Sequence, residues 1–556
     1  MEYRDVQNLP AMFFERAARH GDQPFLWRKA DGAWISQTWR EVEDEIVALA
    51  AGLQRLGVGK GDRVALISEN RPEWLIADVA IMTLGAISVP AYTTNTIHDH
   101  THILSDSGSK CAIVSTAALA KNLLPAAADT ASVETVVAME DIGDAPDDLK
   151  LVSWADATRR DHDLDGPAAA SAIARTDTCC IIYTSGTSGK PKGVMLSHGA
   201  IICNCMGAFE MLRRLPQFNG DSEIFLSFLP LSHSYEHTAG QFFPMSVGAQ
   251  IYYAEGIDKL SANIAEMRPT VMTAVPRLYE AMHTRIRHGV DRAGGLKKYM
   301  FDETLRLGRK AYESPESMTF FERLKNGLLD RLVRAKVKER FGGRLKAFVS
   351  GGAPLNYDIG VFFIALGVRI LQGYGQTESA PVVSCNIPTN NKLHTVGPPM
   401  EGVEVRIAED GEILVRGELV MQGYWNNPEA TAETIRDGWL HTGDIGRLDE
   451  DGYIEITDRK KDIIVNSGGD NLSPARVEGM LTAAPEIGQA MVYGDRRPHL
   501  VAVLVPDEEF LSDWSKKNGK NGSLNDMAAD PDLRKELYDA VERVNAHLSV
   551  IERVRR

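Results

Sequence analysis

A segment rich in hydroxyl side chains and glycines, at residues 183–198, contains the residue types that bind phosphate. It reads YTSGTSGKPKGVMLSH. Glycine lets the backbone approach an anion closely, so that successive N–H groups point at it, while hydroxyls add neutral donors and lysines add positive charge. We therefore expect a phosphate-binding loop built from Thr184, Ser185, Gly186, Thr187, Ser188, Gly189, Lys190, Lys192 and Gly193.

The residues after the first lysine argue against an NTPase loop of the Walker type. In that loop Ser or Thr follows the lysine and opens a helix. Here Lys190 precedes Pro191, which has no N–H to offer a phosphate, and the apolar run at 194–196 predicts a strand. An ordinary glycine-rich surface turn is the remaining alternative.

Composition limits the class of protein. The chain has 556 residues, of which 44% are hydrophobic, and this is enough for two or more domains. A formal net charge of -15 argues against a nucleic-acid partner, because binding a polyanion depends on neutralising phosphates. The six cysteines show no C-x-x-C spacing, so we expect neither disulfides nor a zinc site.

The sequence also indicates a cytoplasmic protein. The N-terminus lacks the basic and apolar stretches of a signal peptide. The most apolar stretch, residues 74–92, is interrupted by Asp78 and Pro90. We expect it to form a buried helix followed by a strand rather than a membrane span.

Positive charge is concentrated between Arg285 and Lys346, a stretch with 17 Lys and Arg and 8 Asp and Glu. Its net charge is therefore +9, and that of the remainder is -24. Apolar residues recur there at intervals of three and four, at Phe321, Leu324, Leu328, Leu332 and Ala335. This spacing predicts an amphipathic helix with a basic outer face. One interpretation is a solvated helix face, and the other is a patch that contacts anionic lipid or attracts an anionic substrate. On the lipid interpretation, vesicle binding would depend on Lys297, Lys298, Arg331, Arg334 and Lys338.

The order of short and long patterns predicts the domain organisation. Up to about residue 380, short β-branched runs alternate with longer helical runs, which predicts stacked α/β layers with a largely parallel sheet. Residues 397–457 read as a β-rich subdomain, and the composition changes near 458–461. We therefore expect an α/β protein with a large N-terminal domain at 1–457 and a small, mobile α+β C-terminal domain at 458–556.

Four further segments accompany the phosphate loop. They are SGGAP (350–354), LQGYGQTE (371–378), WLHTGD (439–444) and TDRKKDIIVNSGGDNLSP (457–474). In type and order the five segments resemble the motifs of adenylate-forming acyl- and aryl-CoA synthetases, most closely the long-chain fatty acid branch. The resemblance extends over nearly the whole chain. GYGQTE alone would be weak, because it departs from the dinucleotide-binding pattern at Glu378, but five ordered segments are specific.

The resemblance implies that ATP and Mg²⁺ activate a fatty acid. A carboxylate is a poor electrophile, and its transfer to the α-phosphate of ATP supplies a leaving group, with loss of pyrophosphate. The implied nucleotide-binding residues are Thr184, Ser185, Gly186, Thr187, Ser188, Gly189, Gly352, Ala353, Pro354, Gln372, Gly373, Tyr374, Gly375, Gln376, Thr377, Asp444 and Arg459.

Individual roles follow from the same resemblance. The loop with Lys192 would hold the departing phosphates, and Thr377 and Glu378 would hold the α-phosphate and Mg²⁺. Residues 352–354 and Tyr374 would enclose adenine. Asp444 would accept the ribose hydroxyls, supported by Arg459. On residue type alone, Asp444 also fits an Asx-turn and Glu378 a helix cap.

The acyl group has its own implied residues. His233, in LPLSHSYEH, matches the family's histidine or aromatic residue beside the acyl carboxylate, and Tyr235 would contact the acyl chain. A structural histidine is the alternative for His233. The implied catalytic residues are thus Lys192, His233, Thr377, Glu378 and Arg459.

The second half-reaction, transfer to CoA, is implied to involve a rotation of the C-terminal domain about a hinge at Lys461. Ser467, Gly468 and Gly469 would then line the channel for the CoA thiol arm, although a simple flexible linker predicts the same mobility. Family members continue past VIERVRR into a segment with an adenylation lysine that has no matching position here. We expect the chain to be truncated there, and to use preformed acyl-adenylate better than it makes it.

These observations predict an ATP-dependent acyl-CoA synthetase for medium- to long-chain fatty acids. The alternatives are an acyl-AMP ligase that loads a carrier protein, and a catalytically silent lipid- or nucleotide-binding homologue. The sequence leaves the oligomeric state open, with a homodimer as one alternative, and peripheral attachment to the inner face of the membrane as one location.

Overall fold

The computed structural model describes residues 2–161, 163–184, 190–462, 464–465, 471–497, 499–520 and 524–555. Contacts divide the chain into two compact units. The first unit comprises Met1–Arg406, Leu414–His441 and Glu450–Ile454. The second unit comprises Ile407–Ile413, Thr442–Asp449 and Glu455–Arg556.

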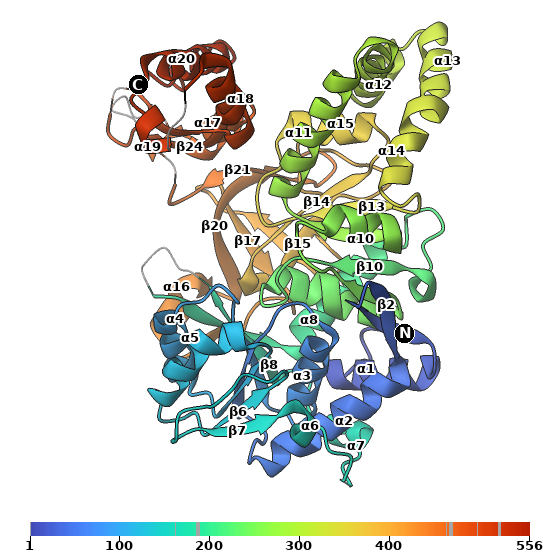
Figure 1. The fold of residues 1–556 in the computed structure, drawn as a ribbon, viewed down its shortest axis with the longest axis vertical. Coiled ribbons are helices and arrows are strands. Elements are labelled where there is room, and N and C mark those ends of the chain that lie inside the picture. Colours follow the sequence, from blue (N-terminus) through green and yellow to red (C-terminus); the bar gives the residue numbers. More distant parts are fainter. Residues whose placement is uncertain are drawn as a thin grey trace. The chain divides into compact units, whose positions relative to one another are not determined.

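Two eight-stranded, mainly parallel sheets form the framework of the first unit (Figure 1). The strands of one follow each other in space as β15 (Val382–Cys385), β14 (Ile370–Gly375), β13 (Ala347–Ser350), β12 (Val271–Ala274), β10 (Ile224–Ser227), β11 (Gln250–Tyr253), β1 (Pro24–Ala30) and β2 (Ala33–Thr38). The other has the order β18 (Gly423–Tyr424), β9 (Lys192–Ser197), β8 (Thr178–Thr184), β4 (Ile87–Pro90), β3 (Arg63–Ile67), β5 (Cys111–Val114), β6 (Thr135–Ala138) and β7 (Lys150–Ser153). Among the described residues of these two sheets, the antiparallel pairs lie towards the sheet ends, at β14–β15, β1–β2, β8–β9 and β9–β18.

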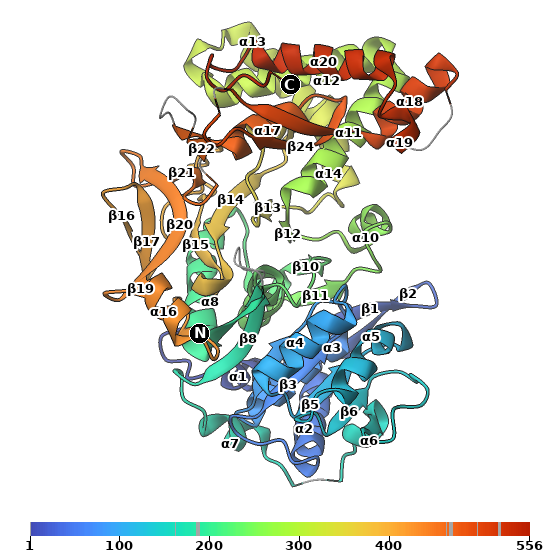
Figure 2. The same cartoon turned by 90° about the vertical axis from the view of Figure 1, so that its left-hand side faces the viewer.

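Helices connect these strands, as expected for parallel neighbours (Figure 2). Those before residue 250 are α1 (Leu9–His20), α2 (Trp39–Arg55), α3 (Pro72–Thr83), α4 (Ile97–Ser107), α5 (Ala117–Ala128), α6 (Trp154–Ala157), α7 (Gly166–Ser171), α8 (His198–Leu212) and α9 (Phe243–Val247). Those after it are α10 (Leu260–Met267), α11 (Pro276–Ala293), α12 (Gly295–Glu313), α13 (Phe320–Leu329), α14 (Ala335–Arg340), α15 (Tyr357–Ala365) and α16 (Pro428–Thr434). Two π-helical turns, η2 (Glu236–Phe242) and η4 (Asp330–Arg334), and three 3₁₀ turns, η1 (Gly220–Ser222), η3 (Pro315–Ser317) and η5 (Thr377–Ser379), complete the set.

A smaller sheet has the strand order β16 (Glu404–Ile407), β17 (Glu412–Arg416), β20 (Trp439–Leu448) and β19 (Ile435–Arg436), with β21 (Ile454–Arg459) also paired to β20. The remaining elements all belong to the second unit: β22 (Ile464–Val465), β23 (Asn471–Leu472), α17 (Pro474–Thr482), β24 (Ile487–Tyr493), β25 (Val501–Pro506), α18 (Glu508–Asn518), α19 (Leu524–Met527) and α20 (Pro531–Asn545). Helix α17 packs on β24, and α20 packs on α17. Their shared core includes Val477, Leu481, Leu500 and Val541.

The predicted α/β class and several individual elements are confirmed. The apolar stretch at 74–92 forms the buried helix α3 followed by strand β4. Residues 194–196 lie in strand β9, as expected from their β-branched and apolar side chains. Among the described residues, no helix combines the length and apolar character that a bilayer span requires. All six cysteines are free and buried.

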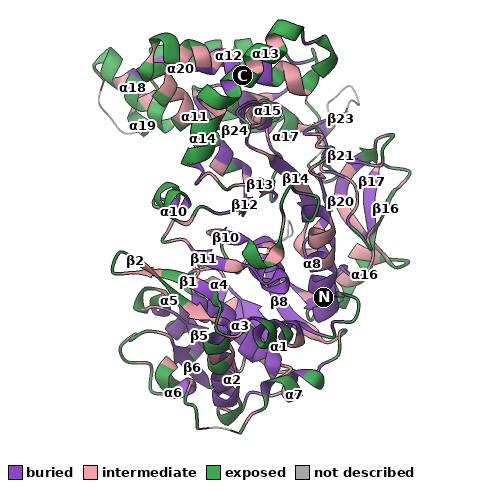
Figure 3. Ribbon diagram, turned by 90° about the vertical axis from the view of Figure 1, so that its right-hand side faces the viewer, coloured by how far each residue is buried: buried purple, intermediate pink, exposed green. Residues whose placement is uncertain are grey.

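The prediction for the basic stretch is wrong in one respect. Residues 320–340 are helical, but the apolar side chains expected to face inward are exposed (Figure 3). Phe321 is 79% exposed, Leu324 65% and Leu328 57%. The repeat correctly predicted one apolar helix face, but no described element covers that face. The outer face is therefore apolar as well as basic.

Candidate functional site

The carboxyl ends of neighbouring strands place the predicted acyl, adenine and metal residues of the first unit. Strands β10, β12, β13 and β14 are parallel neighbours, so the chain leaves all four at the same edge of the sheet. His233 follows β10, Gly352 follows β13, and Thr377 and Glu378 follow β14. Ligands bind at this edge in open α/β sheets.

His233 lies in the turn between β10 and the π-helical turn η2. Its Nδ1 accepts a hydrogen bond from the backbone N–H of Tyr235 at 3.1 Å. Burial lowers the pKa of His233, so the imidazole is neutral near pH 7. Because Nδ1 is an acceptor, the proton of the neutral ring is on Nε2.

Tyr235 connects this turn to strand β13. Its hydroxyl donates to the carbonyl oxygen of Val349 at 2.8 Å, and its ring lies against Gly351. Burial raises the pKa of Tyr235, which keeps the hydroxyl protonated as a donor. The residues predicted for the acyl group and for adenine are therefore adjacent.

Thr377 and Glu378 form the 3₁₀ turn η5 directly after β14. The Thr377 hydroxyl lies 3.1 Å from the Ser234 hydroxyl, which joins this turn to the His233 segment. The Glu378 carboxylate accepts a hydrogen bond from the Tyr424 hydroxyl at 2.7 Å. Burial, together with the nearby Glu378 carboxylate, raises the pKa of Tyr424, so this hydroxyl remains a donor.

Lys192 contacts the same tyrosine, and the two lie on β9 and β18, neighbouring strands of the second sheet. Its Nζ lies 4.5 Å from the centre of the Tyr424 ring, a cation–π contact. Lys192 begins β9, where it pairs with Thr184 at the end of β8. Residues 185–189, which carry the rest of the predicted phosphate loop, lie outside the described residues.

One chain of contacts thus crosses the first unit. It runs through Thr184, Lys192, Tyr424, Glu378, Thr377, Ser234, His233, Tyr235 and Gly351. Residues predicted separately for phosphate, metal and acyl group are thus linked in space, and the chain of contacts ends at Gly351, next to the segment 352–354 predicted for adenine. A positive charge, a carboxylate that can hold a metal ion, and several hydroxyls are groups that stabilise charge during transfer at a phosphate.

Two glycines in the predicted adenine segments are needed for backbone reasons. Gly352 has φ +82°, which disfavours residues with a side chain. At Gly375 a Cβ atom would lie 1.8 Å from the carbonyl oxygen of Pro381, so only glycine fits. The segment 352–354 is exposed, whereas Tyr374 is only 9% exposed.

Buried polar groups hold the turn that carries His233 and Tyr235. The Glu236 carboxyl accepts hydrogen bonds from Ser227 at 2.7 Å and Thr273 at 2.6 Å, on strands β10 and β12. Burial raises the pKa of Glu236 to about 7. At the next residue, His237 Nε2 lies 2.8 Å from the Asp78 carboxylate of α3, with both side chains fully buried.

The pKa of His237 depends on this partner. Burial alone would lower it, but the charge and hydrogen bond of Asp78 raise the pKa of His237 to about 10. The pair is therefore a buried ion pair that connects η2 to α3. Removing either member would leave an uncompensated buried charge.

Asp444 and Arg459 lie together in the second unit. Arg459 Nε donates to Asp444 Oδ1 at 3.1 Å, and the Asp444 N–H donates to the Thr442 hydroxyl at 3.1 Å. The Asp444 side chain is 8% exposed and that of Arg459 is 68% exposed. Lys461 lies in an exposed turn after β21, whereas Ser467, Gly468 and Gly469 lie outside the described residues.

Tyr424 and Ser234 are site residues that the sequence did not reveal. Tyr424 belongs to a GYW segment in the region read as a β-rich subdomain, and no spacing rule relates it to Glu378 or Lys192. Ser234 adjoins His233 and was within the motif LPLSHSYEH. A hydroxyl beside the predicted histidine was the one available signal.

Family models and curated proteins match nearly the whole chain. The family model of the AMP-binding enzyme matches residues 13–425, and that of the AMP-binding enzyme C-terminal domain matches residues 461–556. The long-chain-fatty-acid–CoA ligase FadD15 of Mycobacterium tuberculosis is 35% identical over 554 residues, covering 99% of this chain and 90% of its own. The peroxisomal long chain acyl-CoA synthetase 6 of Arabidopsis thaliana is 32% identical over 539 residues, covering 92% of this chain and 74% of its own.

Solved structures share the fold. The anthranilate CoA ligase AuaEII in complex with anthranoyl-AMP has a TM-score of 0.72 at 21% identity, covering 100% of this chain and 94% of its own. The A-PCP didomain of the carboxylic acid reductase from Segniliparus rugosus, in complex with AMP, has a TM-score of 0.76 at 20% identity, covering 100% and 78%. With its motifs in order, its two-sheet framework and family matches over both parts, the chain belongs to the family of AMP-binding enzymes.

Proposed function

We infer that this protein is an ATP-dependent fatty acid–CoA ligase that forms an acyl-adenylate and transfers the acyl group to CoA. The observation that carries this proposal is the continuous chain of contacts from Thr184 and Lys192 through Glu378 to His233 and Gly351. The named activities of relatives at 35% and 32% identity support it. The preference for medium- to long-chain fatty acids rests on those relatives.

In the first step, a carboxylate oxygen of the fatty acid attacks the α-phosphorus of ATP and pyrophosphate leaves. We assign Lys192, with the hydroxyls and N–H groups of residues 184–189, to the departing phosphates, where positive charge and donors stabilise the transition state. Thr377 would bind the α-phosphate oxygen. Residues 352–354 and 372–376 would hold adenine, and Asp444 with Arg459 the ribose.

His233 is suited to the fatty acid carboxylate. Because its ring is neutral and Nε2 carries the proton, it can donate a hydrogen bond without neutralising the nucleophile. The proposed acyl path begins at His233 and Tyr235. Tyr235 contributes shape rather than charge, because its hydroxyl is already bonded to Val349.

The residues around Glu378 fit a magnesium ion. Mg²⁺ is commonly held by one or two carboxylates together with substrate phosphates, and here a half-buried carboxylate adjoins the Thr377 hydroxyl. When bound, the ion would neutralise charge on the phosphates. Tyr424 would orient the Glu378 carboxylate through its 2.7 Å hydrogen bond.

In the second step, the CoA thiolate attacks the acyl carbonyl carbon and AMP leaves. Ser467, Gly468 and Gly469 remain the proposed channel residues, and Lys461 the proposed hinge, near a domain boundary at 458–461. Peripheral attachment to the inner face of the membrane is a further part of the proposal, and the oligomeric state stays open between monomer and homodimer.

A substrate panel tests the proposal. The purified protein is incubated with ATP, Mg²⁺, CoA and fatty acids of increasing length, and AMP, pyrophosphate and acyl-CoA are quantified. We expect AMP and acyl-CoA in equal amounts, dependent on the fatty acid. One further arm replaces CoA with an acyl carrier protein, to distinguish acyl-CoA formation from carrier loading. Another arm supplies preformed acyl-adenylate with CoA, to test the second step by itself. Absence of product in every arm would sink the proposal.

A further inference from the structure

An unusual surface of the first unit lies on α13 and the π-helical turn η4. Five large apolar side chains, here called the apolar stripe, are exposed there: Phe320 (76%), Phe321 (79%), Leu324 (65%), Leu328 (57%) and Leu332 (42%). All except Phe320 recur at the three- and four-residue spacing of one helix face. Soluble proteins rarely expose contiguous apolar surface without a binding role.

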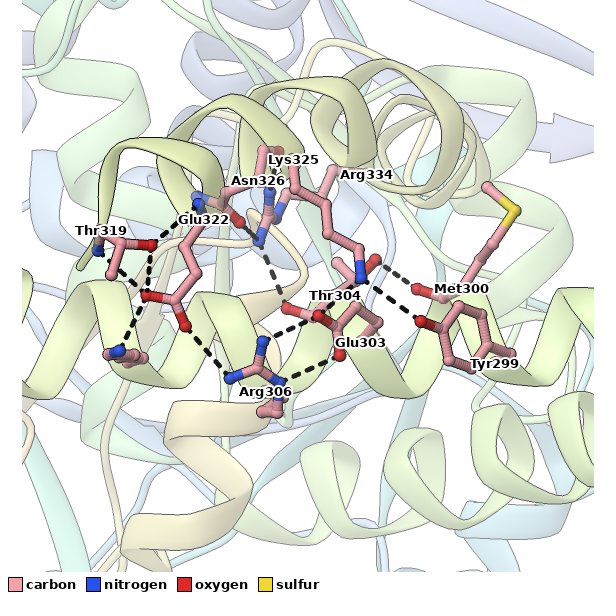
Figure 4. A network of polar contacts seen from close by, with 11 residues as sticks. Tyr299, Met300, Glu303, Thr304, Arg306, Thr319, Glu322, Lys325, Asn326 and Arg334 are labelled. Atoms are coloured by element: carbon pink, nitrogen blue, oxygen red, sulfur yellow. Dashed lines mark hydrogen bonds and ion pairs between the residues drawn. The ribbon is translucent and has the colours of Figure 1, made fainter.

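The orientation of the apolar stripe is determined by polar contacts on the opposite face of α13 (Figure 4). Glu322 caps the helix with Thr319 and accepts a hydrogen bond from Lys310 at 2.8 Å. Leu329 is buried with Leu307 and Met318. Turning the apolar stripe inward would break these contacts, so outward is its stable orientation.

Arg334 and Lys325 strengthen this attachment. Arg334 donates to the carbonyl oxygen of Ala365 at 2.6 Å and to the Asn326 side chain at 2.8 Å. Lys325 donates to Glu303 at 2.9 Å, on the neighbouring helix α12 (Figure 4). Arg334, whose side chain is 10% exposed, is thus held by internal contacts rather than available as the surface cation that the sequence suggested, whereas Lys298 forms an exposed ion pair with Asp291.

Other cations flank the apolar stripe. Arg331, Lys336 and Lys338 are exposed, and within the described part of the chain none of them has an ion-pair partner. They belong to the stretch that carries +9 in a protein of net charge -15. A helix face of Phe and Leu bordered by Lys and Arg matches the requirements of an anionic bilayer surface.

A second copy of this chain fits the surface less well. An interface between two identical faces would oppose the same cations, and like charges destabilise such contacts. Anionic lipid instead attracts these cations while the apolar stripe enters the headgroup boundary.

We propose that α13, η4 and the start of α14 form a lipid-docking surface, with the apolar stripe inserted at the interface of an anionic membrane and Arg331, Lys336 and Lys338 against its headgroups. The proposal deepens the peripheral attachment suggested under the proposed function, and it would place the enzyme where long-chain fatty acids partition. It does not depend on the chemistry of the site.

The test uses the full chain and two vesicle types, phosphatidylcholine alone and phosphatidylcholine mixed with phosphatidylglycerol. We expect co-sedimentation with the mixed vesicles, and at least roughly tenfold weaker partitioning for the triple variant Phe321→Gln, Leu324→Gln, Leu328→Gln. Ile257→Gln is the matched control, because Ile257 is 75% exposed elsewhere on the first unit. A Phe321→Trp variant should show blue-shifted fluorescence with the mixed vesicles.

A charge arm tests the lipid class. Arg331→Glu with Lys336→Glu should abolish the preference for phosphatidylglycerol, whereas Lys121→Glu with Lys259→Glu, an equal charge change elsewhere, should largely preserve it. Equal binding of the triple variant and the parent would overturn the proposal. Failure of the parent protein to bind the mixed vesicles would also overturn it. That holds even if the chain forms a dimer that the triple variant dissociates, because the apolar stripe would then be a protein interface. Acyl-CoA formation from a short, water-soluble fatty acid should be unchanged in the triple variant, which separates this proposal from the proposed function.

Discussion

Two regions of the first unit use charged side chains in opposite ways. Around Tyr424, Lys192 and Glu378 both contact one neutral residue and, among the described residues, neither has an ion-pair partner. On α12 and α13, Glu303 is paired with Arg306 and Lys325, and Glu322 with Lys310. The first arrangement leaves charge available for a ligand, whereas the second neutralises charge to attach one helix to another.

The difference shows why a charged cluster is not by itself a site. The ion pairs of α12 and α13 lie near the surface, where each contributes little to stability. The groups beside Tyr424 lie at the carboxyl edge of a parallel sheet and are held in place without being neutralised. Substitutions in the two regions should therefore affect different measurements.

The largest effect is expected at Glu378. Glu378→Gln keeps the size of the side chain but removes its charge, and we expect ATP-dependent acyl-CoA formation to fall roughly 100- to 1000-fold, as for loss of one preorganised electrostatic group. The rate of AMP release measures it. Glu303→Gln is the matched control, with an unchanged rate, and comparable losses in both variants would remove the distinction between the regions.

Glu236 and Glu303 should show opposite pH dependence of stability, with the larger effect at Glu236. Its pKa is about 7 in the fold, raised by burial from 4.5, so the unfolded chain loses the proton first and stability falls as pH rises from about 4.5 to 7. The loss approaches about 3 kcal/mol. Glu236→Gln should remove this pH-dependent loss of stability. Calorimetry at pH 5 and pH 8 should therefore show that the stability of the variant, relative to that of the parent, is higher at pH 8 than at pH 5. A constant difference between the two proteins would contradict this.

Substitutions of Tyr424 should have an intermediate effect on activity, with separate contributions from its hydroxyl and from its ring. Tyr424→Phe removes the hydrogen bond to Glu378 but keeps the ring beneath Lys192, and we expect about a tenfold loss in kcat/KM for ATP with a higher Mg²⁺ requirement, since a hydrogen bond to a charged group is worth roughly 1.5–3 kcal/mol. Tyr424→Leu should lose more.

Tyr453 provides the matched control for Tyr424. Its hydroxyl donates to the carbonyl oxygen of Asn390 at 2.8 Å, and Lys392 Nζ lies 4.5 Å from its ring centre. Tyr453→Phe makes the same chemical change at a hydroxyl that donates to a backbone carbonyl. An equal rise in the Mg²⁺ requirement for both variants would show that Tyr424 acts through general stability.

The smallest effect is expected at Glu303. Hydrogen bonds from Arg306, followed by those from Lys325, lower the pKa of Glu303 to about 2. Its contribution to stability is therefore present above about pH 4.5 and is lost as pH falls towards 2. Because the pair lies near the surface, Glu303→Ala should cost about 1 kcal/mol or less at pH 7. A larger cost, measured as a shift in the thermal midpoint, would mean that this network is essential to the helix pair.

Much of the fold could be predicted from local pattern. Helix α3 and strand β4 were expected because Asp78 and Pro90 interrupt the apolar stretch at 74–92. Asp78 itself was read only as an interruption, whereas it forms the buried ion pair with His237. Its partner lies 159 residues away, and no local pattern reveals such a pairing.

The amino-acid sequence by itself determined which residue types are suited to phosphate and carboxylate, because glycines, hydroxyls and lysines act through local backbone freedom and side-chain chemistry. It also determined the alternation of strands and helices, because periodicity is a local property. Only the tertiary structure decided that Tyr424 joins Lys192 to Glu378, since three strands from two sheets must meet for that contact. It likewise decided that the apolar stripe faces outward. The sequence of a helix shows that one face is apolar, but not whether another element packs against that face.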